Sequence, residues 1–153
     1  MDALTYTRLN ECGTLDNLFN DAYWDGVGKC WTAGVGCTGA NITRGTHLTD
    51  TEVLSLYASR HSIAERGAES DIGPDVWEGL NDVRQAAFID MAFQMGVVGL
   101  SGFHRMIAAA RDGDWAGVKC EALNSRQAVQ TPGRAQRNAN MLFTGKWQPG
   151  YGA

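Results

Sequence analysis

The sequence predicts an α+β fold in which a small, glycine-rich β-hairpin lobe and a larger all-helical lobe are joined by one long helix. Three observations carry this prediction. Residues 13–39 are rich in glycine, which suits hairpins and tight turns. A capping box and apolar residues at helical spacing predict a long helix over about residues 49–66. Further helical patterns follow to about residue 147. Such an arrangement leaves a cleft between the lobes, where ligands bind.

Length and composition are those of an ordinary soluble domain. A chain of 153 residues, 44% apolar and 20% charged, can bury a core as a single domain. No run approaches the roughly 20 apolar residues that span a bilayer. The N-terminus, MDALTYTRLNE, lacks the basic and apolar segments of a secretory signal, so we expect synthesis in a cytoplasm and no membrane partner. The net charge of −4 argues against nonspecific nucleic-acid binding.

The N-terminal part predicts a helix followed by the β lobe. Asp2 is expected to cap a helix over residues 2–11, which Gly13 ends. The β lobe then covers about residues 13–47 and closes with a polar connector. In the next break, after the long helix, Pro74 fixes a turn.

The helical lobe is expected over about residues 74–147 together with the first helix. Residues 81–96 are apolar nearly all round, so this helix should be buried at the centre of the lobe. One or two helices follow up to a break near Asp112, and another begins at Trp115. The last helix begins near Pro132, where a proline is tolerated in the first turn.

The stretch AYWDGVGKCWTAGVG, residues 22–36, holds the candidate catalytic groups. As a hairpin it places Asp25 at the end of one strand and Thr32 on the returning strand, where they can share a face. Glu11 stands at the end of the first helix. An acid, a carboxylate and a hydroxyl around one hairpin can protonate a leaving group and hold a water. A glycine-rich hairpin with an acid is more often only a hairpin, so the pattern alone leaves both interpretations open.

The cysteines predict neither a metal site nor a cofactor. They lack CxxC spacing, and no cysteine–histidine cluster suggests zinc. In a cytoplasmic chain they are most often free thiols, although a Cys12–Cys30 or a Cys37–Cys120 bridge stays open.

Several motifs together resemble the phage-type lysozymes, endolysins of glycoside hydrolase family 24. These motifs are AFIDMAFQMG, GLSGF, a tryptophan twelve residues after Phe103, QTPGRAQR and FTGKW. The resemblance runs from about Leu48 to Trp147. TRLNE and YWDGVG…TAGVG match the N-terminal pattern of the family less tightly.

The resemblance implies a muramidase that cleaves the β-1,4 bond between N-acetylmuramic acid and N-acetylglucosamine in peptidoglycan. It implies an inverting glycosidase, acting as a monomer for host-cell lysis after its release from the host cytoplasm. Glu11 takes the position of the general acid, Asp25 that of the carboxylate that orients or activates water, and Thr32 that of the hydroxyl that holds the water.

Four more residues fall at positions that bind substrate in the family: Phe93, Thr38, Glu121 and Arg134. Phe93 can equally be a core aromatic. Arg134 falls where the family has an arginine near the catalytic glutamate, and a surface helix arginine is the other interpretation. Thr38 and Glu121 differ in residue type from the family, which weakens their assignment.

Two departures from the family pattern concern the site itself. About five extra residues separate Glu11 from Asp25, so Asp21 lies almost at the family distance from Glu11. We favour Asp25, because a longer surface link is tolerated better than a larger turn between the carboxylate and Thr32. An expected histidine–carboxylate pair is also absent, since its positions hold Cys37 and Arg60.

Two rival classes remain. A noncatalytic wall-binding or phage tail structural module would explain the extra residues and the missing pair, but the retained Glu11, Asp25 and Thr32 argue against it. A helix-turn-helix over LTDTEVLSLYASRHSIAERG lacks a turn signal at its middle. The sequence leaves open whether the chain acts as a free endolysin or within a larger particle.

Overall fold

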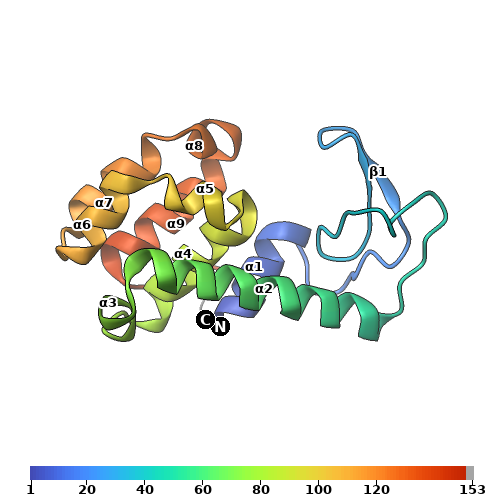
Figure 1. Ribbon diagram of the computed structural model, residues 1–153, viewed down its shortest axis with the longest axis horizontal. Coiled ribbons are helices and arrows are strands. Elements are labelled where there is room, and N and C mark those ends of the chain that lie inside the picture. Colours follow the sequence, from blue (N-terminus) through green and yellow to red (C-terminus); the bar gives the residue numbers. More distant parts are fainter. Residues whose placement is uncertain (151–153) are drawn as a thin grey trace. The chain divides into compact units, whose positions relative to one another are not determined.

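The computed structural model describes residues 1–150, which form helix α1, the hairpin of strands β1 and β2, and helices α2 to α9 (Figure 1). The predicted α+β class is confirmed as a mostly helical chain with one small antiparallel sheet in the described residues. Two compact units divide the chain. We call residues 8–61 the hairpin unit, and residues 1–7 with the described residues from 62 onward the helical unit. The cleft between lobes and the single-domain assignment stay predictions.

Helix α1 (Ala3–Cys12) begins and ends where the sequence predicts. The backbone N–H of Thr5 donates to Asp2 Oδ1 at 2.7 Å, which is the expected N-terminal cap. Gly13 ends the helix with a φ of 70°. Glu11 therefore lies in the last turn of α1.

The β lobe predicted over residues 13–47 contains one short hairpin. Strand β1 (Tyr23–Asp25) pairs with β2 (Cys30–Thr32), and residues 26–29 form the turn between them. The rest of this lobe consists of turns and two isolated bridges, one of which joins Asp21 to His47.

Helix α2 (Asp50–Ile72) has the predicted start, but it is longer than the sequence predicts. At its start the Thr49 N–H donates to Glu52 Oε2 at 2.7 Å, and the Glu52 N–H donates to Thr49 Oγ1 at 3.2 Å. The predicted end near residue 66 is wrong. Gly67 stays helical and buried inside α2. The side chain of Val97 packs against it so closely that a Cβ at position 67 would lie only 2.5 Å from the Val97 methyl groups, so a larger residue would not fit.

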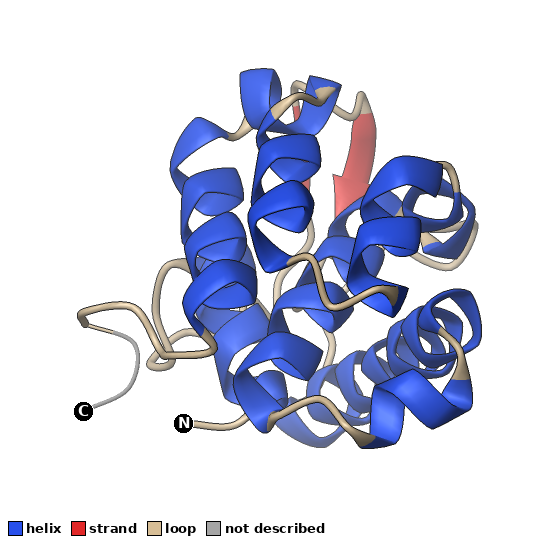
Figure 2. Ribbon diagram, turned by 90° about the vertical axis from the view of Figure 1, so that its left-hand side faces the viewer, coloured by secondary structure: helices blue, strands red, loops and turns tan. Residues whose placement is uncertain are grey.

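Within the helical unit, α9 packs against α4, α7 and α8, and α7 packs against α6. Figure 2 shows that helices make up most of the chain and that strands form only a small part of it. The central helix α4 is buried from Phe88 to Phe93, as its apolar sequence predicts. Helix α8 is a short element that the sequence does not reveal. The helices after α2 are α3 (Pro74–Glu78), α4 (Asp82–Met95), α5 (Val97–Ser101), α6 (His104–Arg111), α7 (Trp115–Leu123), α8 (Arg126–Gln130) and α9 (Pro132–Thr144).

Among the described residues, no helix combines the length and the apolar character that a membrane span requires.

Candidate active site

The register of the hairpin brings four side chains to one face. Tyr23 lies opposite Thr32 and Asp25 lies opposite Cys30. Directly opposed residues of an antiparallel pair, and residues two apart on one strand, point to the same side. Asp25 and Thr32 therefore share a face, as the sequence predicts. The other face carries Trp24 and Trp31, whose ring centroids are 5.7 Å apart.

Asp25 is held by the turn that follows it. Its Oδ1 accepts the Val27 N–H at 2.9 Å, which orients the half-buried carboxylate. A Cβ at Gly28 would lie 2.8 Å from Asp25 Oδ2 and 3.2 Å from Cys30 Sγ. Only glycine at position 28 therefore leaves the carboxylate and the thiol where they are.

Thr32 lies at the opposite corner of this face and is 4% exposed. Its hydroxyl Oγ1 is 3.8 Å from Cys30 Sγ, and either atom can be the donor. Since Cys30 also lies opposite Asp25, the thiol stands between the carboxylate and the hydroxyl.

Glu11 lies against the turn that follows β2. Ala33 and Cys37 close this turn with two backbone hydrogen bonds of 2.9 Å. Gly36 has a φ of 65°, and a Cβ there would lie 3.4 Å from Glu11 Oε2. The half-buried carboxyl group of Glu11 is thus close to the backbone of the turn.

Arg60 replaces the missing ion pair with contacts to the same turn. Its Nη1 donates to the carbonyl oxygens of Val35 at 3.0 Å and Gly36 at 2.7 Å, and lies 3.9 Å from Cys37 Sγ. Cys37 and Arg60, the two positions at which the resemblance predicts a histidine–carboxylate pair, are therefore in contact.

The Tyr23 phenol lies on the same face of the hairpin as Asp25. Partial burial raises the pKa of the Tyr23 phenol, and Asp25, Cys12, Glu11 and Cys30 raise it further in that order. Glu11 and Asp25 thus act electrostatically on one phenol. Tyr23 is not among the residues predicted for the site, although the two-residue period of a strand places it beside Asp25.

Asp21, the competing aspartate, belongs to a different contact. Its Oδ1 lies 2.7 Å from His47 Nδ1, and the two side chains are 88% and 62% exposed. This pair connects the segment before β1 to the polar connector.

The predicted substrate-binding residues fall in both units. Thr38 is exposed in the hairpin unit. In the helical unit, Glu121 lines a groove of about 880 Å³, and Phe93 is buried in α4. Arg134 is 9% exposed, so its interpretation as a surface arginine is wrong.

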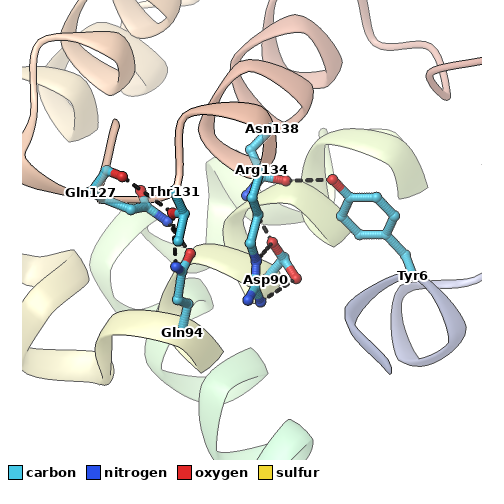
Figure 3. Close-up of polar contacts among 7 residues, drawn as sticks. All are labelled: Tyr6, Asp90, Gln94, Gln127, Thr131, Arg134 and Asn138. Atoms are coloured by element: carbon cyan, nitrogen blue, oxygen red, sulfur yellow. Dashed lines mark hydrogen bonds and ion pairs between the residues drawn. The ribbon is translucent and has the colours of Figure 1, made fainter. Parts of the chain in front are cut away.

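Arg134 belongs to a buried polar network in the helical unit (Figure 3). Arg134 donates hydrogen bonds to the Asp90 carboxylate, and Asn138 Nδ2 donates to Asp90 Oδ2 at 2.8 Å. Tyr6 at the start of α1 donates its hydroxyl to Asn138 Oδ1 at 2.6 Å. Within residues 1–150, no three His, Cys, Asp or Glu side chains are arranged to hold a metal ion.

The family model described as phage lysozyme matches residues 14–140 of this chain. The pre-baseplate central spike protein Gp5 of Enterobacteria phage T4 is 40% identical over 100 residues, which cover 64% of this chain and 17% of Gp5. Two Dictyostelium discoideum proteins are also similar. Probable T4-type lysozyme 1 is 30% identical over 99 residues, which cover 64% of this chain and 58% of that protein. Probable T4-type lysozyme 2 is 28% identical over 106 residues, which cover 69% of this chain and 62% of that protein. The chain thus spans less than two thirds of each relative.

Proposed function

The chain belongs to the phage lysozyme family, and on that premise we propose that it is a muramidase that hydrolyses peptidoglycan. The bond cleaved is the β-1,4 bond between N-acetylmuramic acid and N-acetylglucosamine. The observation that supports this most is that Asp25 and Thr32 share one face of the hairpin, while the carboxyl group of Glu11 lies against the turn that follows β2 in the same unit.

In the proposed mechanism Glu11 donates a proton to the glycosidic oxygen as the bond breaks. Asp25 accepts a hydrogen bond from the attacking water and activates it, and the Thr32 hydroxyl holds that water. Attack from the face opposite the leaving group inverts the anomeric carbon, so no covalent intermediate forms. The Val27 N–H supports this role for Asp25, because it holds the carboxylate in one orientation on the face of Thr32.

Substrate binding is proposed for Phe93, Thr38, Glu121 and Arg134, from their correspondence to the family positions. Glu121 has the strongest support, since it lines the groove of about 880 Å³ in the helical unit. Asp90 holds one edge of the Arg134 guanidinium through Nε and Nη2, which limits the directions in which this cation can bind a ligand.

The proposed setting is host-cell lysis by a monomer that leaves the host cytoplasm to reach the wall. A second candidate is a noncatalytic tail module, which the relationship to a phage T4 spike protein favours. Both candidates would bind the wall, so binding cannot distinguish them. Only the muramidase would also hydrolyse it.

Digestion of purified peptidoglycan separates them. A muramidase releases soluble fragments with new reducing ends on N-acetylmuramic acid, and an inverting enzyme first produces the α-anomer. A noncatalytic module would sediment with the wall and leave the number of reducing ends unchanged.

A further inference from the structure

Cys30 occupies a place on the hairpin that the proposed chemistry has not used. The four side chains of this face stand at the corners of a square, with Asp25 and Thr32 on one diagonal and Tyr23 and Cys30 on the other. Diagonal neighbours in an antiparallel pair have Cβ atoms roughly 7–8 Å apart. A water that bridges Asp25 and Thr32 would lie over the middle of this face, where Tyr23 and Cys30 are on either side of it.

The two residues on the second diagonal differ in what they contact. The Tyr23 ring packs toward Phe19, with ring centroids 6.2 Å apart. The Cys30 thiol lies 3.8 Å from the Thr32 hydroxyl. It also lies near Asp25 Oδ2, because a Cβ at Gly28 would approach both of these atoms, at 3.2 Å and 2.8 Å. The Cys30 thiol thus adjoins both the carboxylate and the hydroxyl.

We infer that Cys30 is a positioning residue of the proposed muramidase. Its thiol orients the Thr32 hydroxyl and forms the floor of the water site between Asp25 and Thr32. This inference rests on the proposed function, because it assigns a role in holding the attacking water. A thiol is a weak donor and a weak acceptor, so it can direct the hydroxyl without competing strongly for the water.

The same position makes the site sensitive to thiol chemistry. Methyl methanethiosulfonate converts a thiolate to a methyl disulfide, with the thiolate sulfur attacking the sulfenyl sulfur and methanesulfinate leaving. A methylthio group on Cys30 would fill the space between Asp25 and Thr32. The other three cysteines differ from Cys30 in reactivity or in position. Burial raises the pKa of the Cys12 thiol, and Cys37 is itself buried. Cys120 is exposed, but it lies on α7 of the helical unit. A raised pKa slows reaction, because the thiolate is the nucleophile.

The test compares Cys30→Ala, Cys30→Ser and the matched control Cys120→Ala with the wild type on purified peptidoglycan. We expect Cys30→Ala to lose about tenfold in kcat with KM changed less than twofold, since the lost contact acts on the water and not on the sugar. Cys30→Ser keeps a polar group at this position and should retain at least half of kcat. Cys120→Ala should match the wild type, and the melting temperatures of all three variants should stay within about 5 °C of the wild-type value.

Treatment with methyl methanethiosulfonate gives the second readout. The wild type and Cys120→Ala should lose more than nine tenths of their activity and recover it in dithiothreitol, whereas Cys30→Ser should be resistant. The inference is overturned if Cys30→Ala keeps the kcat of the wild type, if its loss follows a fall in melting temperature, or if Cys30→Ser is inactivated equally. A wild type that makes no reducing ends overturns the proposed function and this inference together. An active wild type whose kcat is unchanged in Cys30→Ala overturns the inference alone.

Discussion

Asp90 on α4 binds Arg134 on α9 through two parallel hydrogen bonds, from Nε to Oδ2 at 2.9 Å and from Nη2 to Oδ1 at 2.8 Å. Both side chains are buried, with exposed fractions of 0% and 9%. A bidentate pair of this kind fixes the orientation of the guanidinium. It also makes each charge depend on the other, because a buried charge without its partner is strongly destabilising.

Replacing Asp90 with Ala should lower the free energy of unfolding by about 3–5 kcal/mol, since it leaves the Arg134 guanidinium buried without its carboxylate. Urea unfolding followed by circular dichroism measures the change. The exposed Asp112 provides the matched control, and Asp112→Ala should lie within about 0.5 kcal/mol of the wild type. A loss below about 1 kcal/mol for Asp90→Ala would show that the pair does not stabilise the helical unit.

Arg60 should stabilise the turn that lies beside Glu11. Arg60→Met removes the donor to the Val35 and Gly36 carbonyls, and a charged hydrogen bond contributes about 1.5–3 kcal/mol. We expect a loss of about 2 kcal/mol in the free energy of unfolding, together with a lower kcat. Arg66→Met, an exposed position on the same helix, is the control and should change neither quantity. Equal behaviour of the two variants would contradict the role of Arg60.

The capping box of α2 should make stability depend on pH. Hydrogen bonds from the Thr49 N–H and then from the Thr49 hydroxyl lower the pKa of Glu52 below its ordinary value. The unfolded chain therefore binds the proton more tightly, and the stabilisation is present above the unfolded pKa and lost as pH falls through the folded pKa. Glu52→Gln should lower the melting temperature at pH 7 and have little effect at pH 3. Glu65→Gln, exposed on the same helix, should show no such difference.

Local patterns predicted the parts of the fold whose partners are close in sequence. Asp2 caps α1 three residues away, and Thr49 and Glu52 form their box across the same spacing. The two-residue period of a strand placed Asp25 and Thr32 on one face. Residues this close meet in almost any tertiary arrangement, so the sequence alone is informative.

Contacts between distant segments were not predictable in the same way. Gly67 lies inside α2 and packs against Val97, which is on another helix 30 residues further along the chain. Asp90 and Arg134 are 44 residues apart, and nothing around either of them indicates the other. The catalytic roles came from the resemblance to a family, because an acid near a hairpin has no specific meaning without it.

The choice between two aspartates follows from the contacts in the hairpin unit. Asp25→Asn should lose at least a hundredfold in kcat, the range expected for removal of a general base. Asp21→Asn should retain most of the activity, because Asp21 binds the exposed His47 and lies before the paired strands that carry Asp25 and Thr32. Its effect on stability should stay below about 1 kcal/mol, as for other exposed ion pairs. The reverse pattern of activities would move the catalytic role to Asp21.

Glu11 carries the central claim, that this chain cleaves glycosidic bonds by protonating the leaving oxygen. Its carboxyl group can be replaced with an amide of nearly the same size in Glu11→Gln, which cannot donate the acidic proton. Circular dichroism and the melting temperature should match those of the wild type, so that any loss of activity is chemical.

The most direct measurement is the rate at which new reducing ends appear in purified peptidoglycan with the wild type and with Glu11→Gln. We predict steady release by the wild type and a rate at least a hundredfold lower for the folded variant. A folded Glu11→Gln that keeps a tenth or more of the wild-type rate would contradict the assignment of Glu11 as the acid. A wild type that releases no reducing ends would contradict the muramidase itself.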